Sequence, residues 1–153
     1  MTRRLSSLHA RTICHATEDI AKVEQALRTV VGDAPIERSR TEGHFGNAIE
    51  VLESTLKDED LIMGVLERMT DEDLANVGTT LAMRTDDACQ VFIRLDKQRA
   101  YHEELRLSDG EDVVAVRIKV RAFPAKPELA TEIMRGVLGD MAAGRRPRAD
   151  RAR

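Results

Sequence analysis

The sequence is poor in aromatic residues, with no tryptophan, one tyrosine and three phenylalanines among 153 residues. So few rings argue against a nucleic-acid-binding mode dominated by base stacking. No run of 18 or more apolar residues occurs, so the sequence predicts no transmembrane helix. The N-terminal segment MTRRLSSLHART lacks the apolar stretch that a secretory signal peptide requires. We therefore expect a cytoplasmic protein without a membrane partner.

Cysteine is also scarce, since the chain has only Cys14 and Cys89. The two lie far apart in strand-like segments and form no C-x-x-C pattern. We interpret them as buried free thiols in a reducing compartment, with a disulfide or a metal role as the alternative.

Motifs of catalysis are missing as well. The chain has no G-x-S-x-G motif and no glycine-rich phosphate loop. His9 and His15 share one face of a strand, but six residues separate them by about 20 Å, too far to bind one metal. Asp86 and Asp87 stand between a helix and a strand, where acids commonly bond turn backbone. We predict no catalytic site, no cofactor and no metal. The alternative is a metal-dependent or small-molecule enzyme.

The composition is that of a soluble globular domain: 42% of residues are hydrophobic and 33% are charged, with a formal net charge of -3. We predict one α+β domain over residues 1–143, followed by a disordered arginine-rich tail at 144–153. The acidic balance argues against nucleic-acid coating by the whole protein. A local basic face remains possible, because phosphate responds to the nearby patch.

Hydrophobic periodicity divides the chain into ten elements. Alternation predicts strands at 8–15, 36–41, 48–56, 89–95, 105–107 and 113–123. Apolar stripes predict helices that begin after Thr17, Asp58 and Thr70 and at Pro127, with the last ending near Gly139. Consecutive strands with short turns favour an antiparallel sheet with helices packed on one face.

Basic residues recur on the strand face that the helices leave open. Alternation in 113–123 directs Val114, Val116, Ile118, Val120 and Ala122 to one side and directs Arg117, Lys119 and Arg121 to the other. Phe92, Arg94 and Arg11 fall on the same open face, while Arg38 and Arg40 share one face of 36–41. Such a surface can bind phosphates and stack a base. The alternative is that these cations keep the face soluble and pair with Glu37, Glu50 or Glu53 across strands.

Four segments of the sequence, in this order, carry a resemblance: HATED (15–19), EGHFGN (42–47), RLDKQRAY (94–101) and VRIKVRAFP (116–124). Together they resemble an archaeal family of exosome-associated RNA-binding proteins, also catalogued as a domain of unknown function, over about residues 7–139. The resemblance implies an α+β fold similar to ribosomal protein L5, and an RNA-related role with exosome or ribosome components as possible partners. The matching positions are His44, Gly46, Asn47, Arg94, Asp96, Lys97 and Tyr101.

The segment RLDKQRAY then has a specific interpretation. We predict that Asp96 caps a turn or short helix carrying Lys97, Arg99 and Tyr101. Lys97 and Arg99 would extend the cationic rim begun by Arg94, and Tyr101 would either stack on a base or pack in the core.

The sequence therefore predicts a non-catalytic RNA-binding protein that contacts single-stranded or structured RNA through a basic open sheet face. The alternative is an adaptor that docks on an RNA-processing or ribosomal complex without contacting RNA. The predicted RNA-binding residues are Arg11, Arg38, Arg40, His44, Asn47, Phe92, Arg94, Lys97, Arg99, Tyr101, Arg117, Lys119 and Arg121.

Overall fold

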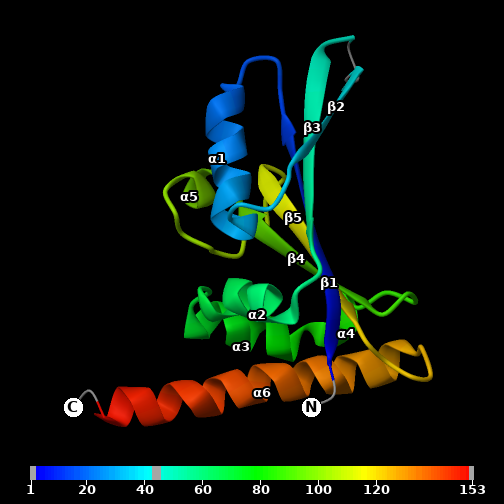
Figure 1. Cartoon of the computed structure of the whole chain (residues 1–153), viewed down its shortest axis with the longest axis vertical. Helices are drawn as coiled ribbons and strands as arrows, with labels where there is room; N and C mark the ends of the chain where they lie inside the picture. The colour runs from blue at the N-terminus through cyan, green and yellow to red at the C-terminus, as the bar shows by residue number, and fades with distance from the viewer. Residues whose placement is uncertain (1–2, 43–45, 152–153) are drawn as a thin grey trace.

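Figure 1 shows the computed structural model of the chain, which describes residues 3–42 and 46–151, the last seven as backbone alone. The five strands are β1 (Leu5–Cys14), β2 (Glu37–Glu42), β3 (Ala48–Leu56), β4 (Gln90–Asp96) and β5 (Val113–Val120). They form one sheet in the order β2-β3-β1-β5-β4. Every neighbouring pair is antiparallel.

The helices pack against one face of this sheet. They are α1 (Ile20–Val31), α2 (Glu59–Glu67), α3 (Asp71–Thr79), α4 (Leu81–Arg84), α5 (Lys97–Tyr101) and α6 (Pro127–Arg151). In Figure 1, α1 and α5 lie side by side near one end of the sheet, while α2, α3 and α6 lie near the other end. The predicted α+β class, with an antiparallel sheet and helices on one face, is confirmed.

Alternation along the strands produces the core. Every second residue of β5, from Val114 to Val120, is at most 2% exposed, and β4 follows the same pattern. These side chains meet the apolar stripes of the helices, including Leu27 of α1, Leu66 of α2 and Met134 of α6, in one hydrophobic cluster. Burial of this apolar area is the main driving force for the fold. It also determines which strand residues remain on the other, uncovered face.

Capping residues define the helix ends, and one of them differs from the prediction. Helix α1 begins after Asp19, whose side chain accepts a hydrogen bond from the Ala21 amide, and not after Thr17. The reason is a turn in which the Glu18 amide bonds to the His15 carbonyl and delays the helix. Gly32 ends α1 at φ 63° as predicted, and Asp58 and Thr70 cap α2 and α3 as predicted.

Three further segments differ from the sequence-based expectation. Residues 105–107 form no strand, but a single bridge between Leu95 and Leu107. Strand β5 ends at Val120 and not at residue 123. The backbone of α6 continues to Arg151, past the end predicted near Gly139 and through the segment from 144 predicted to be disordered. Alanine and arginine, frequent in that segment, are good helix formers even where apolar residues are few.

Two predictions about polar and thiol groups are confirmed. The Asp86 carboxylate accepts hydrogen bonds from the amides of Ala88 and Gln90, so it stabilises a turn. Cys14 and Cys89 are buried free thiols. Within the described residues, no helix combines the length and the apolar character needed to cross a bilayer.

Candidate RNA-binding surface

The face of the sheet opposite the helices is built from alternate residues of β1, β3, β4 and β5. Directly opposed residues of antiparallel strands point to the same side. One row across the sheet is Phe92, Arg117, His9 and Thr55. The next row is Arg94, Ala115, Arg11 and Glu53. The register therefore brings Arg11, Phe92, Arg94 and Arg117 onto one surface, called the open face below, as the alternation predicted.

Three cations of the open face keep their positive charge uncompensated by an acid. Arg94 Nη2 donates to the Gly110 carbonyl at 2.6 Å, and Lys119 Nζ donates to the Ala88 carbonyl. Arg117 is exposed, and no partner for it exists among the described residues. A carbonyl oxygen orients a guanidinium or ammonium group but carries no net charge. These cations are therefore positioned without being neutralised.

Arg11 differs from the other cations of the open face, because an acid stands beside it. Arg11 Nε lies 3.3 Å from Glu53 Oε1, and His9 Nε2 lies 3.6 Å from the same oxygen. His9 Nδ1 also lies 3.0 Å from Thr55 Oγ1. The cross-strand pairing that the sequence offered as an alternative thus holds at Glu53. Arg11 and His9 therefore share one acid, whereas Arg94 and Lys119 contact carbonyl oxygens.

An aromatic ring lies within the basic part of the open face. Phe92 is 40% exposed and stands directly opposite Arg117 across the β4–β5 pair. Arg121 follows the end of β5 and is also exposed. The arrangement can attract phosphates and offers a ring for one base.

Arg38 and Arg40 lie on the wrong side of the sheet for this surface, so their predicted place on it is wrong. Their cross-strand partners are Leu52, which is fully buried beneath the helices, and Glu50. Arg38 Nη2 pairs with Glu24 Oε1 of α1 at 3.0 Å. Ile36, which shares their strand face and packs against the core, was the signal in the sequence for this orientation.

Lys97 is buried, so its predicted place on the cationic rim is also wrong. Its side chain is 4% exposed, and Nζ lies 2.9 Å from the Ile13 carbonyl, 3.0 Å from Glu18 Oε1 and 2.7 Å from Asp112 Oδ1. Burial alone would lower the pKa of Lys97, but hydrogen bonds to Asp112 and Glu18 outweigh it, so the pKa is raised. Lys97 is a structural cation that joins α5 to the end of β1.

The remaining residues of RLDKQRAY also lie on the helix side. Asp96 caps α5 as predicted, accepting a hydrogen bond from the Arg99 amide at 2.9 Å. Arg99 pairs with Glu104 at 2.9 Å. Tyr101 packs against the core, with Lys22 Nζ 5.7 Å from its ring centroid. Within RLDKQRAY the chain therefore passes from the open face at Arg94 to the helix layer from Lys97 onward.

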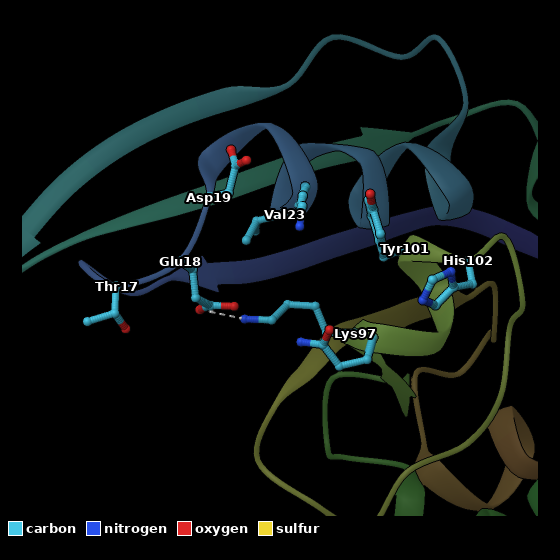
Figure 2. A pocket seen from close by; sticks show the side chains of 9 residues that line it. Thr17, Glu18, Asp19, Val23, Lys97, Tyr101 and His102 are labelled. Atoms are coloured by element: carbon cyan, nitrogen blue, oxygen red, sulfur yellow. Dashed lines mark hydrogen bonds and ion pairs between the residues drawn. The ribbon is translucent and has the colours of Figure 1, made fainter.

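A pocket of about 560 Å³ opens between α1 and α5. Figure 2 shows Lys97 extending to Glu18 at one end of the pocket, with Tyr101 and His102 at the other end. Glu18 and Asp19 both line it. Lys22 and Lys97 line it as well, so two acids and two bases balance, and Lys97 is already paired with Glu18.

The β2–β3 hairpin carries the other predicted residues. Asn47 is exposed and follows Gly46, whose φ of 76° belongs to the left-handed region. His44 lies outside the described residues. The part of the chain that the structure describes holds no cluster of three or more histidine, cysteine, aspartate or glutamate side chains suited to a metal.

An antiparallel sheet with helices packed on one face belongs to the class of α+β domains. A family model described as RNA binding matches residues 7–120, and the chain therefore belongs to this RNA-binding family. RNA-binding protein PAB1135 of Pyrococcus abyssi is 38% identical in an alignment of 139 residues that covers 84% of this chain and 90% of that protein.

Solved structures share the fold. Mth689, a DUF54 protein of Methanothermobacter thermautotrophicus, is 33% identical with a TM-score of 0.79, covering 89% of this chain and 99% of that one. The DUF54 protein AF2318 of Archaeoglobus fulgidus is 31% identical with a TM-score of 0.78, covering 87% and 99%. The similarity to ribosomal protein L5 stays a prediction.

Proposed function

We propose that the chain binds RNA through the open face and does so without catalysis. Arg94, Arg117, Lys119 and Arg121 contact phosphates in this proposal. The observation that carries it is the way the first three are held: carbonyl oxygens orient Arg94 and Lys119, and Arg117 is unpartnered among the described residues, so none of these charges is cancelled by an acid. The name of the Pyrococcus relative and the family description support RNA as the ligand.

The physical basis is counterion release. Each phosphate that a lysine or arginine contacts frees condensed cations into solution, so affinity falls as salt rises. Cations already paired with carboxylates would first have to give up that pairing and would contribute less. On this basis Arg38 and Arg99, each paired with a glutamate, are not part of the proposed contact.

The proposal places the protein in the cytoplasm, and the family resemblance suggests exosome or ribosome components as neighbours. An association of that kind is testable by purifying the tagged protein from its native cells with and without ribonuclease treatment. Partners that leave after ribonuclease treatment are tethered by RNA. Partners that remain would favour the adaptor function, in which protein contacts alone make the association.

The direct test is a salt-titrated binding series with labelled RNA, comparing the parent with the double variant Arg117→Ala, Arg121→Ala. At low salt the double variant should bind more weakly than the parent. The steepness of the plot of log affinity against log salt should fall by about 0.7 for each lost contact to single-stranded RNA. Thermal unfolding should change little, because exposed cations contribute little to folding.

The matched control is the double variant Arg38→Ala, Arg99→Ala, which removes the same charge from the helix side. Its affinity and salt slope should equal those of the parent after correction for net charge. If the two double variants weaken binding equally, or if the open-face variant binds as tightly as the parent at every salt, the open face is not the RNA surface.

A further inference from the structure

The open face extends beyond the last residue of β5. The Arg121 amide donates to the Arg4 carbonyl at 2.8 Å, so the backbone still pairs with the chain that leads into β1. Ala122 is 5% exposed and joins the core as the next residue of the buried series. Arg121 and Phe123, on either side of it, are exposed. Arg121 and Phe123 therefore follow Arg117 and Lys119 as exposed residues at the same two-residue spacing, beyond the end of β5 at Val120.

Phe123 has no evident structural role. Its side chain is 78% exposed, although burial of a phenylalanine is worth about 1.5–3 kcal/mol to a folding chain. The Arg121 guanidinium carbon lies 5.7 Å from the centre of the Phe123 ring, which places a cation at the ring without covering it with apolar atoms. An exposed ring beside a positive charge suits a ligand that is both flat and anionic.

A second phenylalanine, Phe92, lies beside the first cation of this series, on the neighbouring strand β4. It stands opposite Arg117 in the β4–β5 register, with its ring partly exposed on the open face. One phenylalanine therefore stands beside Arg117 and the other beside Arg121, with Lys119 between these two cations in the sequence. Alternate residues of a strand lie roughly 7 Å apart, a spacing similar to that of successive phosphates in an extended single strand.

We propose that this stripe, Phe92–Arg117–Lys119–Arg121–Phe123, binds a short stretch of single-stranded RNA that runs along β5. Unpaired bases stack on Phe92 and Phe123, and the phosphates between them meet the three cations. The inference deepens the proposed function and rests on it. It selects single strands because a base inside a duplex has both of its faces covered by neighbouring base pairs.

The test uses Phe92→Leu and Phe123→Leu, which keep apolar bulk and remove the π-face, with single-stranded RNA and with blunt duplex RNA of equal length. Each variant should lose about fivefold or more in affinity for the single strand, the range expected for one lost stacking partner. The salt slope should stay unchanged, because stacking releases no counterions. A fluorescent base analogue in the single strand should be quenched by the parent and less so by both variants.

Leu61→Ala is the control, because Leu61 is a 57% exposed apolar residue on α2, on the helix side. It should bind like the parent. Equal affinity of the parent for duplex and single strand, or unchanged affinity in both leucine variants, would overturn the stacking inference. If the Arg117→Ala, Arg121→Ala variant still loses affinity in that case, the open face remains the proposed RNA surface and only the stacking inference fails. If that variant also binds like the parent, both proposals fail.

Discussion

Two cations of the open face, Arg94 and Lys119, and two of the helix side, Lys97 and Arg106, differ in what faces them. On the helix side, Lys97 meets Glu18 and Asp112, and Arg106 meets Asp73. On the open face, Arg94 and Lys119 meet carbonyl oxygens. The two pairs of residues have the same formal charge but different partners. Lys97 and Arg106 join segments of the fold through carboxylates, whereas the charges of Arg94 and Lys119 are left available for the proposed contact with phosphate.

The largest expected loss of folding stability follows from replacing Lys97. The variant Lys97→Met keeps the aliphatic stem but leaves Glu18 and Asp112 without their buried cation. Removing one partner of a buried pair typically costs about 3–5 kcal/mol, and partial exposure of both carboxylates favours about 3 kcal/mol here. Urea unfolding monitored by circular dichroism measures the loss.

Arg117→Ala is the comparison for this first prediction. It should change the free energy of unfolding by no more than about 0.5 kcal/mol, as surface substitutions usually do. At temperatures where Lys97→Met is still folded, that variant should bind RNA like the parent. Equal stability losses in the two variants would show that the division between structural and binding cations is wrong.

The second prediction is that the carboxylate of Asp73, which is 7% exposed, makes the stability of the fold depend on pH. Its carboxylate accepts hydrogen bonds from Arg106 Nε at 2.9 Å and from the Leu107 amide at 3.0 Å. Burial alone would raise the pKa of Asp73, but these donors outweigh it and lower the pKa. The stabilisation is therefore present above the unfolded value of about 4 and is lost as pH falls through the lower, folded value.

Asp73→Asn should accordingly be less stable than the parent at pH 7, by about 1.5 kcal/mol for the lost charge-assisted bonds. The difference should shrink as pH falls below about 4, because the parent then loses the same charge. Unfolding curves of both proteins at a series of pH values measure this. A stability gap that persists unchanged in acid would mean that packing, and not the carboxylate charge, accounts for the cost of the variant.

Periodicity predicted the parts of the fold that burial controls. Strand 48–56 and the outward positions of β5 were predicted because apolar side chains must reach one core. The short segment 105–107 was wrongly predicted to be a strand, because its local pattern of two leucines around an arginine resembles one. In the structure, Arg106 turns to Asp73, more than 30 residues earlier, and that contact decides its conformation. Pairing between distant charges leaves no periodic signal.

The same limit applies to the predicted site. Arg11, Phe92, Arg94, Arg117 and Lys119 share one surface because strand alternation places them there. Lys97 could not be separated from them by sequence, since its role depends on Glu18 and Asp112, which come from other segments. Phe123 was missed even though alternation over 113–123 already put it on the side of Arg117. The prediction for that strand rested on its cations alone.

The smallest expected effect is a gain in RNA affinity when the acid is removed from the open face. Glu53 is the carboxylate beside Arg11, and both side chains are partly exposed. Glu53→Gln keeps a hydrogen-bond acceptor near Arg11 and removes the negative charge. RNA should then bind about threefold more tightly at low salt, and the salt slope should rise by about 0.7 if Arg11 gains one phosphate contact.

The matched control is Glu24→Gln, which removes the same charge from the partner of Arg38 on the helix side. If RNA lies on the open face, the control should leave the affinity nearly unchanged, since Debye screening over about 8–10 Å limits the reach of a distant charge. Both variants should unfold within about 0.5 kcal/mol of the parent, because exposed ion pairs contribute little. Equal tightening by both variants would mean that RNA responds to net charge and does not distinguish the two faces. Tightening by Glu53→Gln alone would mean that the open face holds the RNA and that Arg11 is a binding cation held back by one acid.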